Sequence, residues 1–174
     1  CALDRHYPDA NVAKWALQFL DPSDATDTMK ILCAMTHGIR EQFSYNRRAQ
    51  KGVQTPEETL LTSRGSCRDF AVLMMEAARS LGIAARFVSG YIFVPDRSGL
   101  AGGGATHAWM QAYLPGAGWI DFDPTNSIIG NRNLIRVGVA WAPEHVLPLW
   151  GTYTGSAEAF IGMEVSVFVT ETAG

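Results

Sequence analysis

The apolar residues change their spacing at Gly82, and this change divides the chain into two kinds of structure. Before Gly82, apolar residues recur three and four positions apart, the spacing of a helix with one buried face. After Gly82, segments such as "IAARFVSGYIFV" and "THAWMQAYL" alternate or are rich in β-branched and aromatic residues, which is typical of strands. Helices followed by strands predict an α+β fold with an antiparallel sheet rather than a doubly wound parallel one.

Local signals place the ends of these elements. Helical spacing occurs over residues 9–20, 23–45, 55–65 and 66–81, and strand patterns occur over residues 83–94, 106–114, 118–125, 134–141 and 163–170. Asp24 is the candidate N-cap of the second helix, and Thr55 followed by Pro56 begins the third. Ser66 and Asp69 form a candidate capping box at the start of the fourth helix. Cys67 therefore lies in the first turn of a largely apolar helix.

Composition limits the class of protein. With 174 residues, 47% of them hydrophobic and 18% charged, the chain is expected to form one domain over residues 1–174. A net charge of -3 gives no indication of a nucleic-acid partner, and no apolar run approaches the roughly 18 residues of a membrane span. Three cysteines are too few for a disulfide framework, so we expect a reducing, cytoplasmic setting. The chain begins at Cys1 without a methionine, which indicates a part of a longer protein.

The position of Cys67 suggests a reactive thiol. Thiols attack as thiolates, and the free N–H groups and dipole of a helix N-terminus favour negative charge. Arg64 and Arg68 add positive charge nearby, and Gly65 is expected to leave the sulfur open to a substrate. A buried structural thiol is the alternative interpretation of this stretch, and Cys33, in an apolar helical pattern, is expected to be such a core residue.

A cysteine nucleophile needs a base and a group that orients it. On the strand over residues 106–114, alternation places His107, Trp109 and Gln111 on one face, so His107 and Trp109 are expected to face a cleft together. The following strand offers Asp121 and Asp123 on one face, and periodicity cannot separate them. Either carboxylate could orient His107 if the two strands pair through the short "PGAG" turn.

Three blocks, "GSCRDFA", "HAW" and "GWIDFDPT", resemble in this order the signature of the transglutaminase-like superfamily, in particular its bacterial, candidate cysteine-protease branch. The resemblance implies a papain-like core with a triad of Cys67, His107 and Asp123, which selects Asp123 over Asp121. Gln111 departs from the glutamate that relatives often carry at this position. The resemblance also implies that a separate N-terminal β domain precedes this catalytic domain.

The implied reaction is acyl transfer or hydrolysis at an amide bond through a thioester, with a protein or peptide as the substrate. The backbone N–H of Cys67 and, by resemblance, the hydroxyl of Tyr45 are candidate oxyanion donors, and Trp109 is a candidate wall of the acyl site. No cofactor and no metal ion are expected. The glycine-rich residues 96–105, which end close to His107, are a candidate flap over the site.

Three other interpretations are open. An arylamine N-acetyltransferase would use the same triad, but it needs a coenzyme A site and the sequence has no phosphate-binding loop. A non-catalytic interaction module would not require these three residue types. A metal site built from Cys67, His107 and Asp123 lacks the second pair of cysteines or histidines that such sites use.

Overall fold

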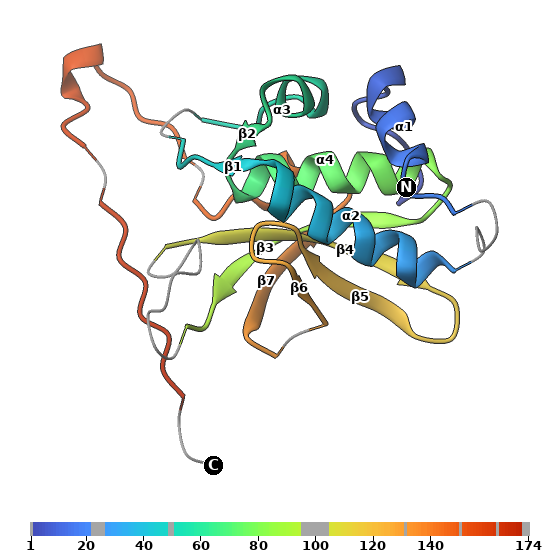
Figure 1. Ribbon diagram of the computed structural model, residues 1–174. Helices are drawn as coiled ribbons and strands as arrows, with labels where there is room; N and C mark the ends of the chain where they lie inside the picture. Colours follow the sequence, from blue (N-terminus) through green and yellow to red (C-terminus); the bar gives the residue numbers. More distant parts are fainter. Residues whose placement is uncertain are drawn as a thin grey trace.

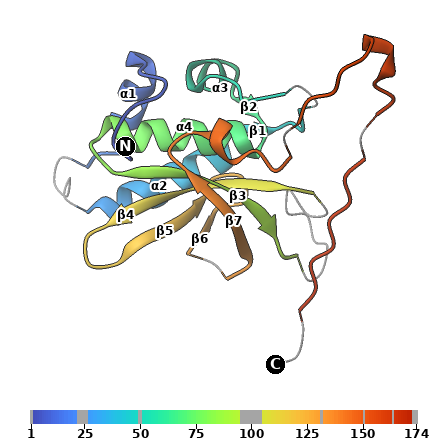
Figure 2. The same cartoon turned by 180° about the vertical axis from the view of Figure 1, so that it is seen from behind.

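Four helices gather on one side of an antiparallel sheet in the computed structural model of the protein (Figures 1 and 2). The structure describes residues 2–21, 27–48, 51–94, 105–130, 132–149, 151–162 and 164–171. The helices are α1 (Ala10–Leu17), α2 (Thr28–Gln42), α3 (Pro56–Thr62) and α4 (Cys67–Ser80). Two short 3-10 helices, η1 (Pro143–Val146) and η2 (Ala157–Ala159), follow the sheet. The predicted α+β class with an antiparallel sheet is confirmed.

The main sheet has five strands in the order β6-β5-β4-β3-β7, and all neighbours are antiparallel. Its strands are β3 (Ala85–Ile92), β4 (His107–Leu114), β5 (Gly118–Asp123), β6 (Ile128–Ile129) and β7 (Leu134–Ala140). A separate parallel pair, β1 (Ser44–Tyr45) and β2 (Arg64–Gly65), lies before the start of α4. The β4–β5 hairpin turns within three residues, as the sequence predicts.

Helix α4 forms the centre of the molecule, between the sheet and helices α1 and α3, while α2 lies beside α4 and also contacts β5 (Figure 1). Apolar side chains of α4 are buried along nearly its whole length, and they pack against the inner face of β4 and β3, while α2 covers part of β5. The inner residues of these strands include Ala108, Met110 and Phe122. Burial of this apolar surface is the main favourable term in the stability of the fold.

A buried ion pair fixes the far end of α4. The Glu76 carboxylate lies 2.8 Å from the Arg79 guanidinium and accepts the backbone N–H groups of His6 and Tyr7, each at 3.2 Å. Arg79 also donates to the carbonyls of Ala85 and of the segment before η1. The two buried charges are therefore paired and hydrogen-bonded, as buried charges must be.

The outer face of the sheet is also covered, which alternation did not predict. The side chains of Val88, Ile92, Trp109 and Leu134 form a second, smaller core there. The prediction that His107 and Trp109 face a cleft together is wrong for Trp109, which is fully buried, and His107 keeps only 1% of its surface exposed. Gln111 on the same face is also fully buried. Only Tyr113 on that strand is exposed.

Two other expectations are corrected. Helix α2 begins at Thr28 with Asp27 as its N-cap, whose side chain accepts the Lys30 N–H at 3.0 Å, whereas Asp24 lies outside the described residues. Residues 164–171 form neither helix nor strand, although their pattern predicted a strand. The described residues from 151 onward extend away from the body of the molecule (Figure 1). Within the described ranges, no helix has the length and apolar character needed to cross a membrane.

Candidate active site

The start of α4 is held by a buried carboxylate. Asp69 Oδ2 accepts both the backbone N–H and the hydroxyl of Ser66 at 2.8 Å, and Oδ1 accepts from Arg48 at 2.8 Å and from the backbone N–H of Gln54 at 2.7 Å. The predicted capping box is therefore present, and Asp69 adds two contacts that spacing could not show. Three segments of chain meet at this carboxylate, so the first turn that carries Cys67 is fixed from several sides.

Gly65 has a different role from the expected one. A Cβ at this position would lie 2.9 Å from the Cβ of Asp69 and 3.0 Å from the Phe70 ring. The missing side chain therefore allows β2 to approach the first turn of α4, rather than exposing the sulfur of Cys67. Cys67 itself is buried, with 7% of its surface accessible to solvent.

His107 contacts Asp123 and not Asp121. His107 Nε2 lies 2.8 Å from Asp123 Oδ2, and both side chains are fully buried. Asn126 donates its amide N–H to the same oxygen at 2.9 Å, and the backbone N–H of Thr125 donates to Asp123 Oδ1 at 3.0 Å. The predicted contact between Asp123 and His107 is confirmed. The contact from Asn126 was not predicted, although an asparagine after "DPT" is a common turn residue.

The second nitrogen of His107 has no described hydrogen-bond partner. Burial alone would lower the pKa of His107, but the charge and hydrogen bond of Asp123, together with the neighbouring Cys67 thiol, raise it to about 10. Nδ1 is buried and has no partner at ordinary hydrogen-bond geometry. The Cys67 thiol is thus close enough to affect the imidazole without a well-formed hydrogen bond, a looseness that is common in ligand-free sites.

Tyr45 borders the same group of residues. It pairs with Gly65 across β1 and β2, two residues before Cys67, and 40% of its surface is exposed. Burial raises the pKa of its phenol, and Cys67 raises it further, whereas Arg47 and Arg68 oppose this shift, so the phenol lies within electrostatic range of Cys67. Tyr45 is therefore a partly exposed side chain near the residue that is the candidate nucleophile.

Trp109 takes a different place from the predicted acyl-site wall. Its ring is fully buried and stacks with the His107 ring, with centroids 6.0 Å apart and planes inclined by 27°. Its indole N–H donates to Asp121 Oδ1 at 2.6 Å. A side chain without accessible surface cannot line an open acyl site, so Trp109 packs beneath His107 instead.

The other histidines have contacts elsewhere. His6 pairs with Glu144 at 3.2 Å, His37 contacts Ser127, and His145 packs on Trp141. Among the described residues, no group of three or more His, Cys, Asp or Glu side chains has an arrangement that could hold a metal ion. The expected flap falls on residues 96–105, of which 96–104 lie outside the described residues.

A family model of the transglutaminase-like superfamily matches residues 13–124. The chain belongs to the transglutaminase-like superfamily. This match covers the first two signature blocks and the third up to Pro124, and so includes Cys67, His107 and Asp123. The family assignment implied by the sequence is therefore confirmed.

Curated relatives of this superfamily member are longer proteins. An uncharacterized protein of Mycobacterium leprae is 38% identical over 113 residues, which are 63% of this chain and 39% of the relative. An uncharacterized protein of Mycobacterium bovis is 32% identical over 147 residues, which are 80% of this chain and 47% of the relative. The chain thus spans less than half the length of these relatives.

Solved structures show the same fold. A candidate cysteine protease from Cytophaga hutchinsonii superposes with a TM-score of 0.65 at 24% identity, over 82% of this chain and 47% of that one. The periplasmic domain of TgpA from Pseudomonas aeruginosa superposes with a TM-score of 0.55 at 21% identity, over 72% of this chain and 46% of that one. At these identities the likeness supports the papain-like fold of the transglutaminase core.

Proposed function

We propose that the protein cleaves or transfers acyl groups at amide bonds through a thioester on Cys67, with a protein or peptide as the substrate. The observation that carries this proposal is the buried pair of His107 and Asp123, whose free imidazole nitrogen lies on the side of the Cys67 thiol. A buried nitrogen without a partner is costly in a purely structural site, and it is what a proton donor to a substrate needs.

The protonated state of His107 fits the first half of the reaction. Because its pKa is raised to about 10, His107 holds a proton at neutral pH. In the reactive pair, Nδ1 of His107 holds the proton lost by Cys67, which reacts as the thiolate. The thiolate attacks the amide carbon, the C–N bond breaks, and the Nδ1 proton of His107 passes to the leaving amine. The backbone N–H of Cys67 and the Tyr45 hydroxyl are the proposed donors to the oxyanion of the tetrahedral intermediate.

The second half of the reaction decides the product. His107, now neutral, takes a proton from water or from a second amine, which attacks the thioester and releases Cys67. Water gives hydrolysis, and an amine gives cross-linking. We favour hydrolysis by a protease or amidase, because one solved structure of this fold is a candidate cysteine protease.

The proposal is tested by incubating the chain with glutamine-containing peptides, with and without a primary amine, and by analysing the products by mass spectrometry. Cleaved peptide, deamidated glutamine and amine conjugate identify the three possible reactions. Substitution Cys67→Ala should abolish every product, whereas Cys33→Ala should leave the rate unchanged. Products that survive Cys67→Ala would refute the proposal, and peptide binding without any turnover would favour a non-catalytic module.

Asp123→Asn measures the contribution of the buried pair. The asparagine keeps the size of the side chain but removes the negative charge that orients the His107 ring and stabilises its protonated form. The value of kcat should therefore fall by about 10² to 10⁴ with little change in KM. The comparison is made on whichever peptide wild type turns over. An Asp123→Asn variant with wild-type kcat would show that this pair does not act in the reaction.

A further inference from the structure

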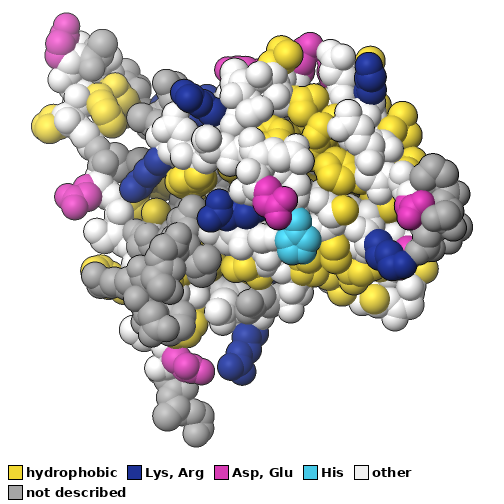
Figure 3. Space-filling model, viewed as in Figure 1, with side chains coloured by type: hydrophobic (Ala, Val, Ile, Leu, Met, Phe, Trp, Pro, Cys, Tyr) yellow, Lys and Arg dark blue, Asp and Glu magenta, His cyan; other side chains and the backbone are white. Residues whose placement is uncertain are grey.

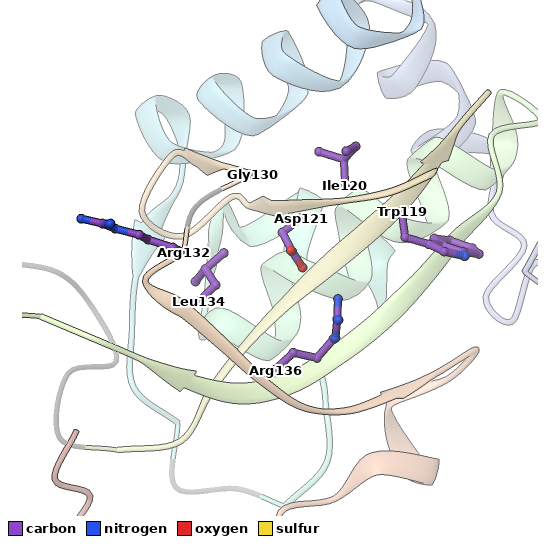
Figure 4. Close-up of a pocket in the computed structure, with 7 residues that line it drawn as sticks. All are labelled: Trp119, Ile120, Asp121, Gly130, Arg132, Leu134 and Arg136. Atoms are coloured by element: carbon purple, nitrogen blue, oxygen red, sulfur yellow. The ribbon is translucent and has the colours of Figure 1, made fainter. Parts of the chain in front are cut away.

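Asp121 lies two residues before Asp123 and has a separate set of contacts. Its Oδ1 accepts the indole N–H of Trp109 at 2.6 Å and the amide N–H of Gln111 at 2.8 Å. The side chain reaches a polar pocket of about 420 Å³ on the outer face of the sheet, where Figure 4 shows it beside Arg136. Asp121 thus satisfies two buried hydrogen-bond donors, which is a structural role inside the sheet and not that of a surface charge.

The Trp109 ring has little freedom to move. It is fully buried, and it stacks with His107 on one side. At the same end of the sheet, Gly90 allows the ring to approach β3, because a Cβ at Gly90 would lie 2.8 Å from the ring. The hydrogen bond to Asp121 fixes the N–H edge of the indole, and the close contact with β3 at Gly90 fixes its opposite edge. The orientation of the Trp109 ring, which stacks with His107, is therefore fixed at both edges.

Gln111, the partner of Asp121 on β4, is held in its orientation by Arg86. Gln111 lies opposite Asp121 in the β4–β5 register, and its side-chain oxygen accepts the Nε–H of Arg86 at 2.9 Å. Arg86 in turn lies 4.1 Å from the centre of the Trp119 ring. Because the oxygen of Gln111 is used by Arg86, its amide N–H group is directed to Asp121. The glutamine that departs from the family pattern thus serves as a donor, which a glutamate could not do without a proton.

We infer that Asp121 is a positioning residue for His107, acting through the indole N–H of Trp109. The inference rests on the proposed function, in which His107 moves the proton. Without the acceptor at residue 121, Trp109 would carry an unsatisfied N–H inside the sheet and would shift to find water or another acceptor. The His107 ring, which stacks on Trp109, would then lose its alignment with Asp123.

The test follows His107 directly, by NMR titration of its imidazole in the whole 174-residue chain. Asp121→Ala should lower the His107 pKa by about one unit, because a misaligned contact with Asp123 stabilises the imidazolium less. Asp121→Asn retains an oxygen that accepts the Trp109 N–H, so it should restore the wild-type titration. Trp109→Phe keeps an aromatic ring but removes the N–H, so it should lower the pKa in the same direction.

The controls separate positioning from loss of stability and from failure of the proposed reaction. Val12→Ala, a truncation of a fully buried α1 side chain, should lower the unfolding midpoint without shifting the His107 titration. A wild-type titration for Asp121→Ala, or an equal shift for Asp121→Ala and Asp121→Asn, would refute positioning through the indole. The titration needs no substrate, so it tests the positioning role of Asp121 even if the protein turns over no peptide. Where turnover is found, Asp121→Ala should reduce kcat by about tenfold at constant KM.

Discussion

His107 and Asp123 show what a sequence can and cannot predict about single residues. Their pairing followed from the "HAW" and "FDPT" blocks, whereas alternation alone left Asp121 and Asp123 equivalent. The capping contact of Asp69 was predicted, but its contacts with Arg48 and Gln54 and the contacts of Asp121 could not be, because these partners lie far apart in sequence or on the neighbouring strand. Trp109 was misplaced, because alternation does not reveal whether a second layer covers the outer face of a sheet.

The raised pKa of His107 predicts a pH dependence of stability. The folded state binds the imidazole proton more tightly than the unfolded state, with a pKa of about 10 in place of 6.5. This contribution to the free energy of unfolding is complete below pH 6.5 and is lost as the pH rises toward 10. Urea unfolding of wild type at several pH values in this range should show a falling midpoint. In His107→Gln the fall should be clearly smaller, and equal slopes would contradict the assignment.

At the scale of elements, the helices were predicted more closely than the strands. Helices α1, α3 and α4 lie within the predicted segments, since N-caps such as Thr55 and apolar spacing are local signals. Residues 164–171 have a strand-like pattern but no neighbouring strand, and β propensity is weak without a partner. The shift of register between Ser89 and Gly90, where β3 pairs with β7, coincides with a glycine inside the strand pattern, but a glycine alone does not identify the partner strand.

Gly90 is the position where β3 tolerates no side chain. A Cβ there would lie 2.1 Å from the carbonyl oxygen of Ile135 on β7 and 2.8 Å from the Trp109 ring. Gly90→Ala must therefore separate two strands or displace the indole, and it should lower the free energy of unfolding by about 3 kcal/mol. Gly151→Ala is the matched control, because a Cβ at Gly151 has no atom within 4 Å. Denaturant unfolding measures the free energy of unfolding of both variants. Equal free energies of unfolding for Gly90→Ala and Gly151→Ala would contradict the close approach of β3 and β7.

At the scale of the whole molecule, one body carries the core and the candidate site, and the last part of the chain projects from it (Figure 3). Hydrophobic side chains of the projecting segment are open to solvent, with Ile161 fully exposed and Phe168 83% exposed. The family model also ends before this segment, at residue 124. Stability is thus expected to come from the residues before it.

Removal of this segment should leave the body folded. A chain that ends at Leu149 loses no residue of the two buried cores, so its free energy of unfolding should lie within about 0.5 kcal/mol of the parent value. Thermal unfolding measures the stability of the shortened chain, and the NMR titration of His107 reports whether the candidate site is unchanged. A loss of more than about 1 kcal/mol, or a shifted titration, would show that the segment supports the body.

The central claim is that Cys67 forms a thioester with the help of His107 and Asp123. The most direct measurement is mass spectrometry of the chain after a brief reaction with 4-nitrophenyl acetate, followed by peptide mapping and treatment with hydroxylamine. We predict a hydroxylamine-sensitive acetyl group on Cys67 in wild type and in Cys33→Ala, and much slower acetylation of Cys67 in His107→Gln and Asp123→Asn. Cys33 is partly exposed and not the core residue that its apolar pattern predicted, but partial burial and the charge of Asp27 raise its pKa, so it should react slowly in every variant. Acetylation of Cys33 at the rate of Cys67, or of Cys67 at the same rate in all four proteins, would contradict the claim.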